Sequence, residues 1–208
     1  MKLYSARCSD YERSAAADDR RFLLFNPIAK MKVTSEGERV IDLLWEVIAA
    51  KGFEKDTYFE QATRHIRTLP KLEGTVHVNL ALVLKFLPAY AAAAAGKPVA
   101  CRAVPVRLDP ADDAFLFAQG PASGLSRIGF QDWRAAFKRF AHLPNVAAFL
   151  AQVQAFGQLM AVAGPQGEQG KDLDFLLSIG QIFTQVVYAQ LVAEAAALAI
   201  DGAVDGTR

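Results

Sequence analysis

One carboxylate in this sequence stands in a setting that suits acid–base chemistry. Residues 67–79 read RTLPKLEGTVHVN, and Glu73 lies between Leu72 and Gly74 with apolar side chains on both sides. A carboxylate held in an apolar, water-poor site binds its proton more tightly and can act as a general base. The same residue could instead cap a helix or lie exposed in solvent, and the stretch by itself leaves these three interpretations open.

The rest of the sequence argues against several other kinds of chemistry. The histidines His65, His77 and His142 have no partners at metal-ligand spacing, so we predict no metal site. Cys8 and Cys101 lie far apart, which favours buried thiols in a reducing, cytoplasmic compartment. The 23 Lys and Arg residues nearly balance the 22 Asp and Glu residues, so no nucleic-acid partner is expected. The sequence contains no G-x-S-x-G, G-x-G-x-x-G or P-loop motif.

Helices must position these residues, because apolar side chains recur at helical spacing along the chain. The 208 residues are 52% hydrophobic and can bury a sizeable core, and the lack of strand–helix alternation predicts an all-α fold. Asn26 and Pro27 are predicted to open one helix, Gly52 to follow its end, and Thr75 to cap the helix after Glu73. The expected helices are, in chain order, 2–17, 27–50, 56–66, 76–95, a short one at 112–118, one marked by Trp133, Phe137 and Phe140, one opened by Pro144, and a long last one after Asp172.

Two apolar stretches are expected to be buried. The inward face of helix 27–50 should consist of Ile28, Met31, Val40, Ile41, Leu44 and Ile48. The stretch 76–96 is nearly long enough to cross a bilayer, but His77, Asn79, Lys85 and Pro88 interrupt it. We therefore expect a buried helix there, with a peripheral membrane contact as the alternative.

Composition divides the chain into three parts. Prolines and glycines gather between residues 97 and 130, whereas the helical period is clear before and after them. We predict a helical bundle over 1–96, a connecting segment over 97–130 and a helical extension over 131–208.

Two motifs in the first part resemble those of the flavin-dependent acyl-CoA dehydrogenases. EVIAAKGF (46–53) is similar to the family pattern Q-x-x-G-G-x-G-[FY], and RHIRTLPKLEGTVHVN (64–79) is similar to R-D-x-[RK]-x-x-x-I-[YF]-E-G-T-x-x-[IV]-Q. Arg64 stands nine residues before Glu73, as in the family, and the separation of the motifs also fits. The resemblance covers about residues 1–90 and implies the up-down helical bundle of the family's C-terminal domain. Members that act on very long or bulky acyl groups also carry helical extensions, and 97–208 resembles one of these.

The resemblance implies a reaction and a set of partners. Glu73 would remove the α-proton of an acyl-CoA thioester while the β-hydrogen passes as hydride to FAD, and Gly74 would lie against the substrate. An apolar wall around the carboxylate could come from Leu69, Pro70 and Leu72. Electron-transfer flavoprotein is the type of acceptor implied, and a homo- or hetero-oligomer is expected. The residues that would contact FAD are Thr75, Val76, His77 and Val78 for one flavin, and Glu46, Ala49 and Ala50 for that of a neighbouring subunit.

The sequence also departs from the family pattern. The family's Gln is Glu46 here, and its Gly-Gly pair is Ala49-Ala50, which adds a negative charge and two methyl groups near a diphosphate. The family's N-terminal helical domain, middle β-barrel and first long C-terminal helix have no counterpart in this sequence. One hypothesis is therefore an enzyme part that another polypeptide segment completes. The other is a non-catalytic bundle that serves oligomerisation or partner binding. The Phe residues of 115–183 are interpreted as core, with an acyl-chain tunnel as the alternative.

Overall fold

The computed structural model describes residues 1–14, 19–93 and 128–204, and every regular element in these ranges is a helix. The predicted all-α class is thereby confirmed. The α-helices are α1 (Lys2–Ser14), α2 (Phe22–Ile48), α3 (Tyr58–Thr68), α4 (Val76–Leu84), α5 (Leu87–Ala91), α7 (Trp133–Lys138), α8 (Pro144–Ala163) and α9 (Leu173–Val204), with 3-10 turns at Ala49–Phe53 and Leu69–Lys71.

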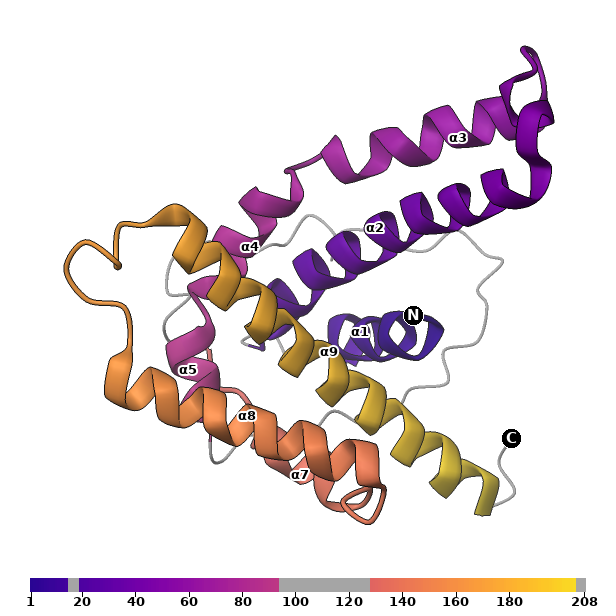
Figure 1. Ribbon diagram of the computed structural model, residues 1–208. Helices are drawn as coiled ribbons and strands as arrows, with labels where there is room; N and C mark the ends of the chain where they lie inside the picture. The colour runs from indigo at the N-terminus through magenta and orange to yellow at the C-terminus, as the bar shows by residue number, and fades with distance from the viewer. Residues whose placement is uncertain (15–18, 94–127, 205–208) are drawn as a thin grey trace, which may run out of the picture.

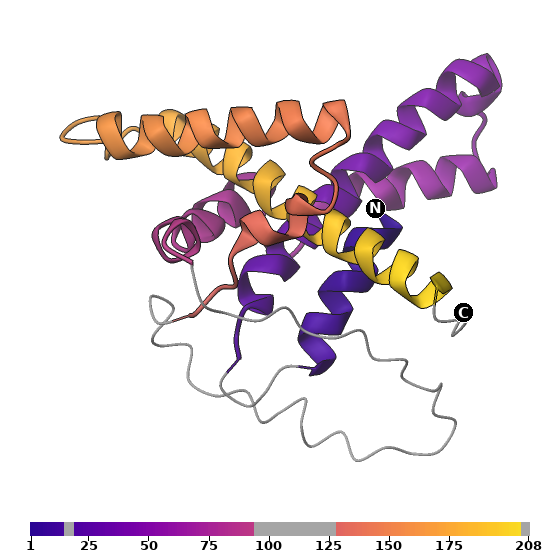
Figure 2. The ribbon, with the colours of Figure 1, turned by 90° about the horizontal axis from the view of Figure 1, so that it is seen from below.

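The helices form a bundle from which one hairpin projects. Helix α9 crosses the molecule and packs against α1, α4 and α7, while α2 packs against α1, α3 and α4 (Figure 1). The C-terminal half of α2 and all of α3 extend away from this bundle as an antiparallel pair, which both views show (Figure 2). We call this pair the α2–α3 arm.

A single aromatic-rich core joins the first part of the chain to α9. Phe25 from α2 and Phe86 after α4 are fully buried, and Phe183 and Leu191 from α9 belong to the same cluster. Burial of one such side chain stabilises the fold by about 1.5–3 kcal/mol. Helix α9 therefore contributes to the same core as the first helices, although the division of the chain at residues 97 and 131 stays a prediction.

Helix α2 begins earlier than the sequence suggested. It starts at Phe22, so Pro27 lies inside the helix, and Asn26 does not cap it but accepts a hydrogen bond from the Cys8 thiol at 2.9 Å. A proline inside a helix destabilises it by about 3 kcal/mol. Leu24 and Phe25, in the turn before Pro27, are completely buried. Their burial stabilises the fold by a comparable amount and offsets this cost.

The predicted inward face of α2 is correct for part of its length. Ile28, Met31 and Ile41 are buried and Ile48 is half-buried, but Val40 and Leu44 are 46% and 41% exposed. The prediction failed because helical periodicity does not reveal where a helix leaves the bundle. Among the described residues, α2 is covered in the arm by α3 and the adjoining 3-10 turns, and no residue of α3 itself is buried.

Some of the other predicted helix boundaries are confirmed, and others lie at different residues. Thr75 caps α4 as predicted, its Oγ1 accepting from the Val78 N–H at 3.4 Å, and Asp172 caps the start of α9. The single helix predicted over 76–95 is instead α4 and α5, because the chain turns at residues 85–86. Pro144 opens α8 as expected, whereas Phe140 lies beyond the end of α7. The predictions for 112–118, Gly96 and Cys101 lie outside the described residues.

Within the part of the chain that the structure describes, two helices are long and apolar enough to cross a membrane by length and composition: Pro144–Ala163 and Leu173–Gly202 of α9. Half of the α9 window is buried inside the protein, which its central place in the bundle accounts for. Only Val153 of α8 is buried.

Candidate functional site

The turn before α4 holds the candidate base in an unusual backbone conformation. Glu73 has φ of 51° and Gly74 has φ of 91°, so two consecutive residues occupy the left-handed region. Glycine adopts this region freely, whereas a residue such as Glu73 does so at a cost of about 1–3 kcal/mol. A side chain at Gly74 would also lie 3.3 Å from the Asn79 amide nitrogen. The conformation persists because other groups hold it.

Two side chains from different helices hold this turn. The Lys30 ammonium group, from α2, donates to the Pro70 carbonyl at 3.1 Å and to the Gly74 carbonyl. The Asn79 amide, buried on α4, donates to the carbonyls of Gly74 and Thr75 at 3.0 Å each. The backbone at Gly74 is therefore fixed before any ligand arrives. The role of Lys30 was not predictable from the sequence, since nothing local indicates a contact across 40 residues.

The Glu73 side chain itself is exposed. Of the three residues expected to form an apolar wall, Pro70 is buried, but Leu69 is 41% and Leu72 is 51% exposed. Arg64, which shares the motif, pairs with Glu60 at 3.0 Å rather than with Glu73. The described residues thus present the carboxylate at the surface beside two half-exposed leucines and do not enclose it.

The first turn of α4 fits one part of the implied cofactor contact. Thr75, His77 and Val78 are exposed here, with Val78 at 60%, while Val76 packs partly against the core. The first N–H groups of a helix lack partners inside it and carry partial positive charge, so this end suits a polar or anionic group.

The second predicted group lies at the other end of the arm. Glu46, Ala49 and Ala50 are all exposed at the end of α2, separated from Glu73 by the length of α3 (Figure 1). An 11-residue helix spans about 16 Å. The structure therefore does not bring the two groups together within one chain. This spacing accords with their implied contacts to two different flavins.

Ala49 keeps the backbone of a glycine. Its φ is 54° and its ψ is −136°, a combination that is essentially confined to glycine. Close by, a side chain at the buried Gly52 would meet the Phe59 ring at 3.2 Å. Gly52 is thus required for packing, whereas the turn out of α2 falls at Ala49. The predicted helix stop at Gly52 was wrong for this reason.

Comparison with protein families supplies the assignment. Residues 2–87 match the family model described as acyl-CoA dehydrogenase, C-terminal domain. These residues are an acyl-CoA dehydrogenase C-terminal domain. Comparisons with curated proteins and with solved structures gave no match.

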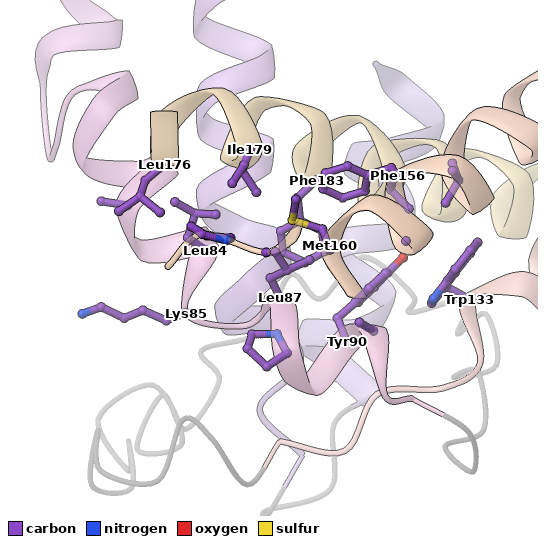
Figure 3. A pocket seen from close by; sticks show the side chains of 18 of the residues that line it. Leu84, Lys85, Leu87, Tyr90, Trp133, Phe156, Met160, Leu176, Ile179 and Phe183 are labelled. Atoms are coloured by element: carbon purple, nitrogen blue, oxygen red, sulfur yellow. The ribbon is translucent and has the colours of Figure 1, made fainter. Parts of the chain in front are cut away.

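The acyl-CoA dehydrogenase C-terminal domain ends near α5, and a cavity lies where the later helices pack against it. Its volume is about 610 Å³, and its walls come from α4 and α5 on one side and from α7, α8 and α9 on the other (Figure 3). Phe156 and Phe183, which were expected in the core with a tunnel as the alternative, line this cavity. Its full wall was not predicted, because it combines side chains about 100 residues apart.

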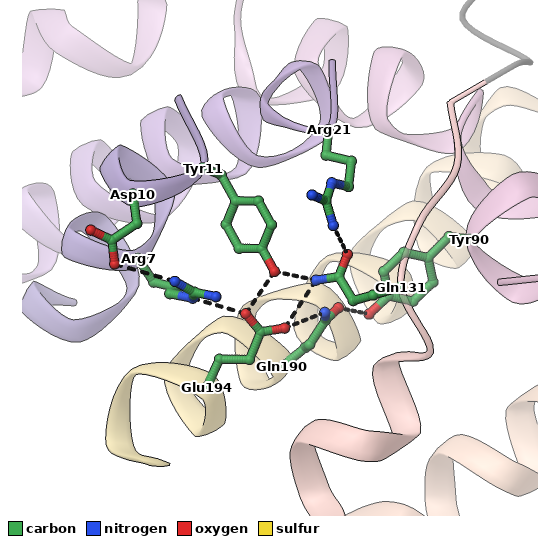
Figure 4. A network of polar contacts seen from close by, with 8 residues as sticks. All are labelled: Arg7, Asp10, Tyr11, Arg21, Tyr90, Gln131, Gln190 and Glu194. Atoms are coloured by element: carbon green, nitrogen blue, oxygen red, sulfur yellow. Dashed lines mark hydrogen bonds and ion pairs between the residues drawn. The ribbon is translucent and has the colours of Figure 1, made fainter. Parts of the chain in front are cut away.

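A buried polar network joins the same domain to α9. The Glu194 carboxylate accepts hydrogen bonds from Arg7 at 2.9 Å, Tyr11 at 2.8 Å, Gln131 at 3.0 Å and Gln190 at 2.7 Å (Figure 4). Burial, and next the charge of Glu194, raise the pKa of Tyr11. The carboxylate is only 7% exposed and is fully engaged, so we assign the network a structural role.

Proposed function

We propose that this chain is the C-terminal part of an FAD-dependent acyl-CoA dehydrogenase and that Glu73 is its base. The observation that carries the proposal is the turn at Glu73 and Gly74, which Lys30 and Asn79 hold in a left-handed conformation with the carboxylate free to meet a substrate. The reaction is α,β-desaturation of an acyl-CoA thioester.

The residues of the turn have separate tasks in this proposal. Glu73 removes the proton at C2, next to the thioester carbonyl. That carbonyl gains negative charge as the proton leaves, and a fixed N–H near Gly74 suits its stabilisation. Because Lys30 and Asn79 fix the backbone beforehand, little reorganisation is needed during the reaction.

The side chains beside Glu73 need a covering surface. Leu69 and Leu72 are each roughly half exposed, and a base acts best where water is excluded. We infer that another polypeptide segment, together with the substrate, covers these leucines in the working enzyme. This accords with the absence of a complete acyl-CoA site among the described residues.

FAD would supply the acceptor for the β-hydride. The residues that fit it best are Thr75, His77 and Val78, at the exposed start of α4. The second set fits less well, since Glu46 brings a negative charge and Ala49 and Ala50 bring methyl groups. We propose that this second set approaches the flavin of a neighbouring subunit in an oligomer. An acceptor of the electron-transfer flavoprotein type would then reoxidise the flavin.

The test uses the protein isolated from its source cells through a tag on this chain, so that polypeptides completing the flavin site stay attached. We expect a flavin absorption spectrum that an acyl-CoA substrate bleaches under anaerobic conditions. Glu73→Gln should retain the flavin and slow bleaching by about 1,000-fold or more. Glu54→Gln, an exposed acid at the tip of the arm, is the matched control and should bleach normally. Bleaching at an unchanged rate in Glu73→Gln contradicts the proposal.

A non-catalytic bundle is the second candidate, and a specific observation favours it. The arm exposes Leu43 at 57%, Val47 at 81% and Phe53 at 72%, so it offers an apolar surface to another protein. Together with Glu46, Ala49 and Ala50, this surface suits an oligomerisation or partner-binding module. Isolation of the chain in an oligomer without flavin would support this candidate over the enzyme.

A further inference from the structure

Helix α8 has an outer face that no described residue covers. Figure 1 and Figure 2 both show α8 at the edge of the molecule, and Val153 is its single buried residue. On the outer face, Leu159 is 55% and Val162 is 86% exposed. Apolar side chains such as Phe149 and Phe156 also line the inner side. A helix that is apolar all round is normally covered on every side, so we expect a partner on the outer face.

The outer face has small side chains in its first half and large ones in its second half. Its members are all exposed and follow one another at spacings of three or four residues, which places them on one side of the helix: Ala148, Ala151, Ala155, Leu159 and Val162. Ala151 and Leu159 are each four residues from Ala155, and Ala148 and Val162 are each seven residues from it.

This order makes the face complementary to itself. In a second α8 that runs antiparallel about Ala155, Ala151 lies opposite Leu159 and Ala148 lies opposite Val162. Each small side chain then receives a large one, which is what close packing of two helices requires. A parallel pair would instead set small side chains against small ones and large against large.

Charges beyond the two ends of α8 fit the same direction. The exposed side chains of Lys138 and His142 precede the helix, and that of Glu168 follows it. Glu168 contacts Lys171 at 3.3 Å, but both side chains are exposed and such a pair is weak. His142 and Glu168 are each thirteen residues from Ala155, so an antiparallel pair brings the basic start of one α8 near the acidic end of the other. The partial charges at the helix ends favour the same direction.

A lipid surface fits this face less well than a protein does. Helices that lie on a membrane carry Lys and Arg along their polar side and large apolar residues on the other. Helix α8 carries no charged side chain between residues 143 and 167, and most of its outer side chains are Ala and Gln. An anionic lipid surface would also repel Glu168 at its end.

We propose that the outer face of α8 binds the α8 of a second copy of this chain, antiparallel and with a two-fold axis at Ala155. A 20-residue helix is about 30 Å long, so this contact lies at the small end of the range for specific interfaces and the dimer should be weak. The surface is distinct from the α2–α3 arm and from the turn at Glu73. The inference does not depend on the proposed function.

The first test maps the contact by disulfide formation in a Cys101→Ser background, in which the remaining Cys8 is buried. On mild oxidation, Ala155→Cys should link two copies, since a residue on the two-fold axis meets itself. Ala151→Cys alone should link far less, because its two copies lie about 12 Å apart along the helices. Mixed with Leu159→Cys, it should form the mixed disulfide. Equal self-linking at positions 151 and 155 would indicate parallel helices and overturn the proposal.

The second test measures association by analytical ultracentrifugation over a range of chain concentrations. Ala155→Glu should weaken the dimer by about tenfold or more, because two like charges meet at the axis. Ala161→Glu makes the same change at an exposed position about 120° around α8, and it should associate like the parent. Any association through the arm is the same in both variants, so their difference isolates α8.

Two results would overturn the proposal in this test. One is association of Ala155→Glu as tight as that of the parent. The other is absence of a disulfide at position 155 together with flotation of the parent on phosphatidylglycerol vesicles that Ala155→Glu abolishes, which would assign the face to lipid. Helix content and the unfolding midpoint of each variant show whether it remains folded.

Discussion

Ala49 has a backbone conformation that favours glycine, so a change at this one residue should alter the stability of the protein. With φ of 54° its methyl group is strained, and the family pattern has glycine at this position. At this residue the sequence departs from the family pattern, and the alanine occupies a backbone conformation that favours glycine.

Replacing Ala49 by glycine should therefore stabilise the protein. We expect Ala49→Gly to raise the free energy of unfolding by about 1 kcal/mol, because the strain exceeds the entropy that glycine adds to the unfolded chain. Ala50→Gly is the control at the next residue, whose φ is not positive, and it should lower stability by about 0.5–1 kcal/mol. Urea unfolding of both variants measures this, and a destabilised Ala49→Gly would contradict the strain.

Lys30 should stabilise the turn at Glu73, and a single substitution tests this. Its ammonium group donates to two carbonyls of the turn, so Lys30→Met should cost about 1–3 kcal/mol of unfolding free energy. Backbone amides of residues 72–75 should exchange hydrogen faster in this variant, which amide exchange measures. Lys51→Met, at the exposed tip of the arm, should change neither quantity. Unchanged exchange in Lys30→Met would mean that Asn79 alone holds the turn.

At the scale of the elements, α9 is bound to α1 by a charged pair inside the protein. Arg7 is 1% and Glu194 is 7% exposed, and their side chains meet at 2.9 Å. Burial lowers the pKa of Arg7, but the charge of Glu194, the nearby Tyr11 and the hydrogen bonds to Glu194 and Asp10 together outweigh this and leave its pKa raised. The buried charge of Arg7 is thus compensated by a residue from α9.

Removing the charge of Glu194 should consequently loosen the packing of α9. We expect Glu194→Gln to lower the free energy of unfolding by about 3 kcal/mol, since breaking a buried pair leaves a charge without full compensation. Glu168→Gln, which alters an exposed pair with Lys171, should cost less than about 1 kcal/mol. Chemical unfolding followed by circular dichroism compares them. Equal effects would show that the network adds little to the attachment of α9.

Sequence patterns predicted some of these elements better than others. The caps at Thr75 and Asp172 and the opening at Pro144 are local signals, and the structure confirms them. The exposure of Val40 and Leu44 was not predictable, because periodicity gives the apolar face of a helix and not its covering partner. The anchor at Lys30 and the cavity under α8 also depend on contacts between distant residues. The family was predicted from the likeness of the motifs at 46–53 and 64–79 to known family patterns, and not from the physical properties of the residues.

For the whole molecule, one buried cysteine thiol and three buried tyrosine hydroxyls predict that the folded state becomes less stable at alkaline pH. Burial raises the pKa of the Cys8 thiol from 9.0 to about 12, and burial also raises the pKa of Tyr4, Tyr11 and Tyr90 above 10.0. The folded protein keeps protons that the unfolded chain releases at these pH values. Stability is therefore complete below about pH 9 and declines as the pH rises further.

Substitution can show which of these side chains causes the loss of stability at high pH. The urea midpoint should fall between about pH 9 and pH 11, first through Cys8 and then through the tyrosines. Cys8→Ala should be less stable at neutral pH but should lose less stability over the first part of this range. Lys2→Gln, exposed in the same helix, is the control and should follow the parent curve. A flat midpoint to pH 11 would contradict the burial of these groups.

The most direct test of Glu73 as the base isolates proton removal from hydride transfer. We would use the protein isolated with its completing polypeptides and an acyl-CoA analogue in which sulfur replaces C3, so that no β-hydride can leave. In heavy water, mass spectrometry then counts the deuterium that enters C2. We expect rapid exchange in the parent and in Glu54→Gln, and exchange slower by about 1,000-fold or more in Glu73→Gln. Exchange at the parental rate in Glu73→Gln would contradict it, because another group would then remove the proton.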